Sequence, residues 1–101
     1  MTLEVKIEGN TVTGILEGRL DTAAAAQFSR DMEPLMDNAD KDIVLDCNKL
    51  EFISSSGLRL FLSLRKASIA KGGKVTITGV SQNIKQVFTI TGFYSLFEFA
   101  D

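Results

Sequence analysis

Three consecutive serines at positions 54–56, followed by a glycine, are the residues whose types and spacing could do chemistry. They stand in the segment FISSSGLRLFL, between a strand-like run and a helix-like run. A serine at a helix start ordinarily accepts a hydrogen bond from an early backbone N–H. The same position suits a phosphate, because the first turn of a helix carries roughly half a positive charge. A cap explains one serine well and three poorly, so phosphorylation is kept as the second interpretation.

Catalysis by these serines is disfavoured by what the rest of the chain contains. The sequence has no histidine, which removes the usual general base and the usual metal ligand. The glycine that a hydrolase elbow places two residues before its nucleophile is also missing, because Ile53 holds that place before Ser55. We therefore expect no catalytic residues, no metal site, no cofactor and no enzymatic activity.

Composition bounds the class of protein. The chain has 101 residues, of which 45% are hydrophobic and 24% charged, and we expect one domain over residues 1–101. Its net charge is -2 and its basic residues are scattered, so nucleic acid is not an expected partner. No signal segment or apolar stretch of membrane-spanning length is present, and the single cysteine, Cys47, fits a reducing compartment. These features predict a cytoplasmic protein without a membrane partner.

The elements that must position the serines follow from patterning. Apolar and charged residues alternate in LEVKIE, which predicts a strand, and Gly9-Asn10 suits a tight turn into a second strand that ends near Leu20. Asp21 can cap a helix whose last turn Pro34 should kink or break. The apolar run in DIVLDC predicts a parallel strand buried on both faces beneath helices.

The second half alternates helices with strands. A helix is predicted from Ser55 or Ser56 to Lys71, then a strand in KVTITGV, then a helix capped by Ser81. The tail YSLFEFAD could add a short edge strand. This order predicts an α/β domain with a small mixed sheet and packed helices.

The motifs of the serine segment resemble a known family. The stretch IVLDCNKLEFISSSGLRLFL, followed by GGKVTITGV and IKQVFTITGF, resembles the STAS domain, and more narrowly the bacterial anti-sigma factor antagonists. EGRLDTAAAAQF resembles the family's second strand, its Gly-x-Leu-Asp turn and its first helix, so the resemblance covers nearly the whole chain. The resemblance implies a regulatory protein that binds an anti-sigma factor and thereby releases the sigma factor. It does not imply an enzyme.

The resemblance also implies a site. The family's phosphorylated serine stands two residues before the glycine, which is Ser55 here. The implied partners are an anti-sigma factor that is a serine kinase and a PP2C-type phosphatase that restores binding. We expect the protein itself to be a monomer or a weak dimer. The implied partner-binding residues are those around the turn: Asp21, Ser54, Ser56, Gly57, Leu58 and Arg59.

Two departures from the family pattern stand out. Ser54 holds a place where many members carry aspartate. Because serines stand on both sides of Ser55, Ser54 or Ser56 is a further candidate for modification. The chain ends at Asp101, about where the family's last helix begins, which predicts a domain without that helix and an open surface around Phe97 and Phe99.

Three alternatives remain open at this stage. A STAS accessory subunit of a transport system would bind its partner constitutively, and replacing Ser55 by aspartate would then leave binding nearly unchanged. A ligand-sensing module would show a melting temperature that rises with nucleotide or lipid concentration. An enzyme would show turnover that a Ser55→Ala change abolishes.

Overall fold

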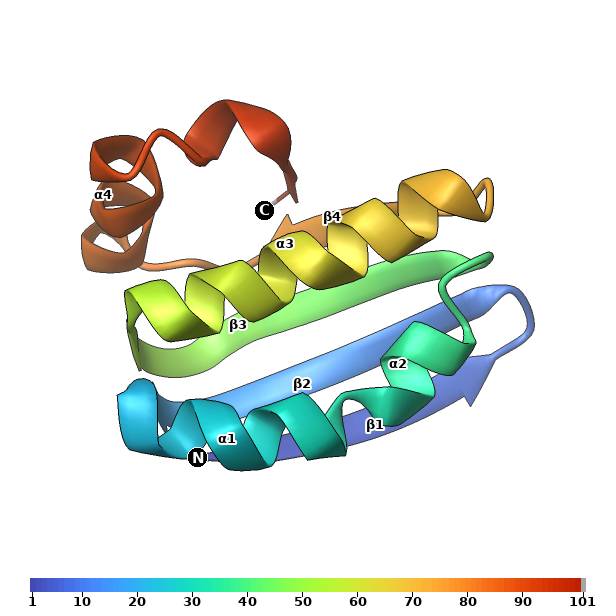
Figure 1. Cartoon of the computed structure of the whole chain (residues 1–101), viewed down its shortest axis with the longest axis horizontal. Coiled ribbons are helices and arrows are strands. Elements are labelled where there is room, and N and C mark those ends of the chain that lie inside the picture. Colours follow the sequence, from blue (N-terminus) through green and yellow to red (C-terminus); the bar gives the residue numbers. More distant parts are fainter. Residues whose placement is uncertain (101) are drawn as a thin grey trace.

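Residues 1–100 are described by a computed structural model, in which five strands form one mixed sheet (Figure 1). The strands lie in the sheet in the order of the sequence, with β1 antiparallel to β2 and every later pair parallel. The strands are β1 (Thr2–Glu8), β2 (Thr11–Leu20), β3 (Asp42–Ile53), β4 (Lys74–Thr78) and β5 (Glu98–Ala100). The helices are α1 (Thr22–Asp31), α2 (Glu33–Asp37), α3 (Ser55–Ala70), α4 (Gln82–Ile90) and the 3₁₀ turn η1 (Tyr94–Leu96). The predicted α/β class with a small mixed sheet is confirmed.

The predicted turn at Gly9-Asn10 and the predicted helix break at Pro34 are both present in the structure. Gly9, with a φ of 61°, and Asn10 form the two-residue loop that joins Glu8 to its partner Thr11. Pro34 lies in the first turn of α2, so the single predicted helix is divided into α1 and α2. Among residues 1–100 no helix is both long enough and apolar enough to cross a membrane.

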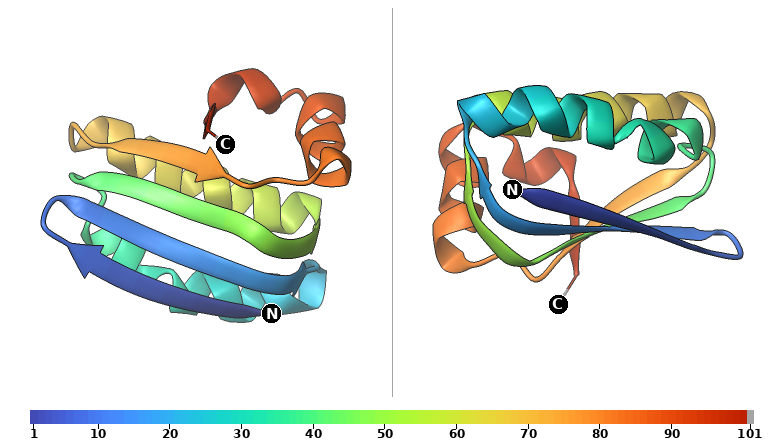
Figure 2. Two further views of the ribbon diagram at one scale, coloured as in Figure 1. Left: turned by 180° about the vertical axis from the view of Figure 1, so that it is seen from behind. Right: turned by 90° about the horizontal axis from the view of Figure 1, so that it is seen from below.

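One face of the sheet is covered and the other is open. Figure 2 shows α1, α2 and α3 on a single face, while the strands are exposed to view from behind. Ile43 and Leu45 point into the core and are fully buried, but Val44 is only half-buried between Thr13 and Thr76 of the neighbouring strands. The prediction that β3 is covered on both faces is therefore wrong. The apolar run of β3 lies in a strand that helices cover on one face only. A β-branched residue such as Val44 is favoured in strands, so it also fits the uncovered face.

Phenylalanine side chains of the C-terminal segment pack around Phe88 of α4. The Phe88 ring on α4 lies 6.3 Å from that of Phe61, 5.5 Å from that of Phe97 and 5.3 Å from that of Phe99. Phe97 is only 8% exposed and Phe99 is half-buried, because β5 pairs with β4 and folds this tail back onto the sheet. The expectation of an open surface is thus wrong for Phe97, and the predicted edge strand is confirmed.

β3 is longer than the sequence pattern indicated, and its length places the serine turn. Its pairing with β2 shifts register twice, so β3 holds one extra residue at each of two points. Asn48 lies at the first shift, where its backbone N–H and side-chain amide both donate to an Asp46 carboxylate oxygen, at 3.0 and 2.7 Å. These irregularities carry the strand on to Ile53, level with the end of β2.

Candidate functional site

Two helices begin side by side at the carboxyl edge of the parallel strands. Leu20 and Ile53 are paired as the last residues of β2 and β3. The Ser54 backbone N–H donates to the Leu20 carbonyl at 2.8 Å, which fixes the two chain ends together. Asp21 and Ser54, the next residues of each segment, therefore start α1 and α3 next to one another, as the resemblance implied for Asp21.

Both starts are capped by side chains. An Asp21 carboxylate oxygen accepts the Ala24 N–H at 2.8 Å, and the Ser54 hydroxyl oxygen accepts the Gly57 N–H at 3.1 Å. Both cap residues have extended backbone angles, as N-cap residues do. Of the three candidate serines, Ser54 is the cap.

The other two serines differ in exposure. Ser55 is the first residue of α3 and is exposed, whereas Ser56 is half-buried. Arg59, one turn further along α3, is also exposed. Residues four apart lie on the same helix face, so Ser55 and Arg59 present their side chains to the same side.

Gly57 and Leu58 hold this turn in place from within. Leu58 is fully buried and Gly57 is buried, so neither presents a side chain on the surface. A Cβ on Gly57 would lie 2.7 Å from the Leu20 Cγ and 3.1 Å from an Ile53 Cγ. Only glycine lets α3 approach the strand ends this closely. These two residues position the site and do not form its exposed surface.

Two neighbours of the turn were missed from the sequence. The Arg19 guanidinium lies 4.5 Å from the centre of the Phe52 ring, and the two residues are paired across the ends of β2 and β3. Phe52 is 36% exposed and Arg19 is exposed. The signal that could have found them is the alignment of the two strand ends, which the irregular register of β3 conceals.

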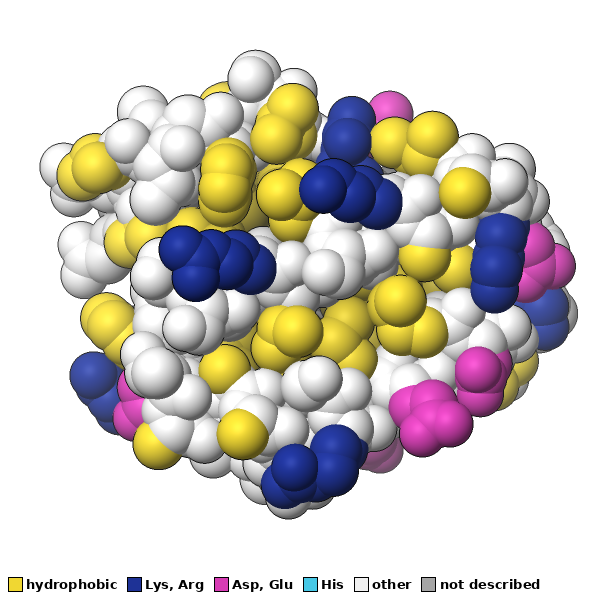
Figure 3. Space-filling view, in the orientation of Figure 1, with side chains coloured by type: hydrophobic (Ala, Val, Ile, Leu, Met, Phe, Trp, Pro, Cys, Tyr) yellow, Lys and Arg dark blue, Asp and Glu magenta, His cyan; other side chains and the backbone are white. Residues whose placement is uncertain are grey.

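The lone thiol is unsuited to chemistry. Cys47 is 1% exposed, and burial together with the neighbouring Asp46 carboxylate raises its pKa from 9.0 to about 12. Within residues 1–100 no three side chains of the His, Cys, Asp and Glu types gather as a metal site would need. On the helix-covered face charged side chains are dispersed among neutral and apolar ones (Figure 3). Cys47 is part of the hydrophobic core.

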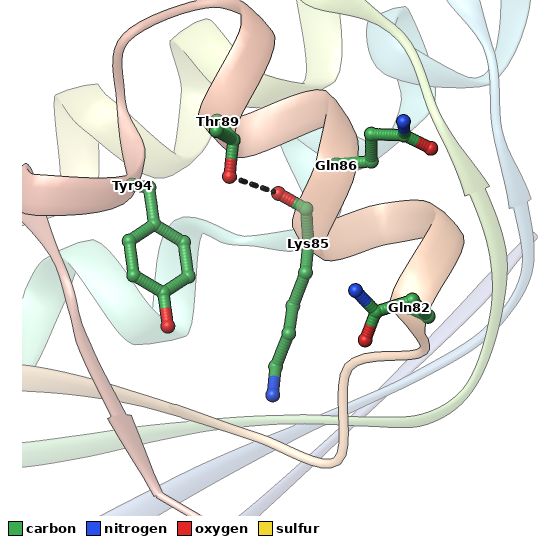
Figure 4. Close-up of a pocket in the computed structure, with 5 residues that line it drawn as sticks. All are labelled: Gln82, Lys85, Gln86, Thr89 and Tyr94. Carbon is green, nitrogen blue, oxygen red and sulfur yellow. Dashed lines mark hydrogen bonds between the residues drawn. The ribbon is translucent and has the colours of Figure 1, made fainter.

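A surface hollow lies on α4, apart from the serine turn. It is lined by Gln82, Lys85, Gln86, Thr89 and Tyr94. Figure 4 shows the Lys85 and Gln82 side chains extending on the same side of α4 as the Tyr94 ring, while the Thr89 hydroxyl donates to the Lys85 carbonyl at 3.0 Å. None of the predicted site residues lines it, so the hollow and the serine turn are separate surfaces.

Comparisons with known proteins agree on one family. The sequence model of the STAS domain matches residues 2–101. A Bordetella bronchiseptica protein provisionally named anti-sigma factor antagonist BtrV is 31% identical over 96 residues, covering 95% of this chain and 82% of that protein. The anti-sigma-B factor antagonist of Staphylococcus aureus is 29% identical over 79 residues, covering 78% of this chain and 73% of that protein.

Solved structures share the fold. An anti-sigma factor antagonist of Thermotoga maritima, so named provisionally, aligns with a TM-score of 0.87 at 20% identity, over 98% of this chain and 86% of that one. The unphosphorylated form of the antagonist SpoIIAA aligns with a TM-score of 0.74 at 22% identity, over 99% of this chain and 88% of that one. The phosphorylated form of Bacillus SpoIIAA aligns with a TM-score of 0.72 at 22% identity, over 99% and 92%.

Proposed function

Because this chain belongs to the STAS domain family, we propose that it is an anti-sigma factor antagonist switched by phosphorylation of Ser55. The unphosphorylated protein binds an anti-sigma factor of the serine-kinase type and so frees the sigma factor. Phosphorylation ends this binding, and a PP2C-type phosphatase restores it. The names of the Bordetella and Staphylococcus relatives support the role, and the two forms of SpoIIAA support a phosphorylation switch.

The proposal rests on the different structural roles and exposures of the three serines. Ser54 gives its hydroxyl oxygen to the helix cap and Ser56 is half-buried, while Ser55 is exposed at the first position of α3. A kinase can reach the Ser55 hydroxyl without opening the fold. The Ser54 that replaces the family's common aspartate keeps the capping role, because serine and aspartate are comparable N-cap residues.

A phosphate on Ser55 suits the isolated domain. The free N–H groups of the first turn of α3 favour negative charge, and the exposed Arg59 lies one turn away on the same side. We therefore expect the domain to stay folded when Ser55 is phosphorylated.

The same phosphate is costly inside an interface. It adds about -1.5 to -2 of charge, and burying a charge without a partner costs about 3–5 kcal/mol. Since about 1.4 kcal/mol is tenfold in affinity, binding should weaken at least 100-fold. The switch therefore acts by blocking docking, with no rearrangement of the domain.

The contact surface in this proposal centres on Ser55 and extends to Asp21, Arg59, Arg19 and Phe52. Arginine and aromatic side chains are enriched at the energetic centres of protein interfaces. Gly57 supports this surface from below by packing on the ends of β2 and β3, and Leu58 is fully buried in the core. In this proposal the protein is a substrate of the kinase and the phosphatase and a binding partner of the anti-sigma factor, and it is not itself a catalyst. It acts in the cytoplasm.

Peptide mass spectrometry of the protein isolated from its native host tests the proposal. We expect phosphate on Ser55 of the wild type and none at this position in a Ser55→Ala variant. Ser63→Ala is the matched control, because Ser63 is an exposed serine two turns further along α3 and its loss should leave the modification unchanged. Absence of phosphate under all growth conditions would favour a constitutive STAS adaptor.

A further inference from the structure

β1 is a free sheet edge of full length. Among the strands that the structure describes within residues 1–100, it pairs with β2 alone, and Figure 2 shows it as the outermost strand of the sheet. The opposite edge, β5, has only three residues, whereas β1 has seven. An edge strand presents a row of unpaired N–H and C=O groups that a further strand can use.

The charged residues of β1 are complementary to those of a second, antiparallel copy of the same strand. The strand reads TLEVKIE, with Val5 at its centre. If a second copy runs antiparallel and the two Val5 residues are opposite, Glu4 of each copy faces Lys6 of the other. Glu4 and Lys6 are both exposed and lie on the same face of the strand, so each such dimer gains two opposite-charge pairs.

The apolar side of β1 agrees with the same register. Leu3 and Val5 are half-buried against the core, but Ile7 is 54% exposed. In the register centred on Val5, each Ile7 lies opposite the partner's Leu3 on the helix-covered side of the sheet. Pairing therefore removes from water a large apolar side chain that one copy leaves uncovered.

Neighbouring registers are disfavoured by charge. A slip by two residues in one direction places Glu4 opposite the partner's Glu4, and a slip in the other places Lys6 opposite the partner's Lys6. A slip by one residue turns every side chain to the wrong face. A lysine on an edge strand usually discourages pairing, but here the favoured register supplies it with a glutamate.

We propose that two copies of this chain associate through antiparallel pairing of β1, with Val5 on the twofold axis. The two five-stranded sheets then form one continuous sheet with an isologous interface. Pairing of a single strand buries less surface than a standard interface, so the dimer is weak and depends on concentration. The lateral edge of the sheet is distinct from the carboxyl edge that holds Ser55, so the proposal does not rest on the function of the serine turn.

Charge reversal at β1, followed by sedimentation velocity over a concentration series of the whole chain, tests the proposal. Lys6→Glu places glutamates opposite one another twice in each dimer and should raise the dissociation constant at least tenfold. Glu4→Lys should do the same with lysines. The Glu4→Lys/Lys6→Glu double variant should recover the wild-type constant, because both opposite-charge pairs return in exchanged positions.

Mixing the two single variants gives the sharpest outcome. Opposite charges then meet at every pair, so a heterodimer of Glu4→Lys with Lys6→Glu should form where neither variant associates alone. Lys66→Glu is the matched control, since Lys66 is exposed on α3 and its reversal should not change association. Circular dichroism checks that each variant is folded. A wild type that stays monomeric at all concentrations, or a dimer indifferent to Lys6→Glu, would overturn the proposal.

Discussion

Ser54 and Ser55 are adjacent hydroxyls with different roles, and replacing each by alanine should separate those roles. The Ser54→Ala change removes the acceptor of the Gly57 N–H, now at 3.1 Å, and leaves a donor unsatisfied at a buried residue. Loss of such a cap lowers the free energy of unfolding by about 0.5–2 kcal/mol, and typically by about 1. For a domain near this size, 1 kcal/mol lowers the melting temperature by roughly 4–8 °C.

Thermal and urea unfolding followed by circular dichroism measure both variants. Ser55→Ala removes an exposed hydroxyl that does not serve as the cap, so its free energy of unfolding should stay within about 0.5 kcal/mol of wild type. Ser54→Asp should restore what Ser54→Ala loses, because aspartate caps about as well as serine. A Ser55→Ala loss as large as that of Ser54→Ala would refute the assignment of the cap.

Three further changes test the packing around the site. Gly57→Ala gains up to about 1 kcal/mol of helix propensity, but its Cβ lies 2.7 Å from the Leu20 Cγ, so urea unfolding should show a net loss of about 1–2 kcal/mol; a net gain would contradict this packing. Ser68→Ala should raise the free energy of unfolding by about 1 kcal/mol and the melting temperature with it, because the Ser68 hydroxyl is buried and has no hydrogen-bond partner within residues 1–100; a loss would show that this hydroxyl is bonded. Burial raises the pKa of the Cys47 thiol from 9.0 to about 12, so the unfolded chain loses this proton first. The thiol should therefore not change the free energy of unfolding below pH 9, and should lower it between pH 9 and 12 with a slope approaching about 1.4 kcal/mol per pH unit. A Cys47→Ala variant should lack that part of the decline, and an identical decline would assign it to other groups.

Signals that act within a few residues were readable from the sequence. The Gly9-Asn10 turn, the break at Pro34 and the cap at Ser81 all act through neighbouring backbone groups, and each is present in the fold. The placement of a cap among residues 54–56 was also readable, but its assignment to Ser54 required the bond to Gly57.

Features that depend on how strands meet were not readable. The end of β3 was obscured because its buried residues are spaced two apart to Cys47 and three apart from there to Ile53, through the two register shifts. Those shifts set the pairing of Arg19 with Phe52, which no pattern in either strand alone predicts. Burial of Phe97 likewise arises from contact with Phe88 in a different element.

Affinity measured with and without a phosphate on Ser55 tests the central claim most directly. The probe is the serine-kinase anti-sigma factor of the same host, titrated by calorimetry against the wild type and against the chain with phosphoserine incorporated at position 55. The account predicts binding of the unphosphorylated chain and a loss of at least 100-fold on phosphorylation, while circular dichroism shows both forms folded. Equal affinity of the two folded forms would contradict the phosphorylation switch.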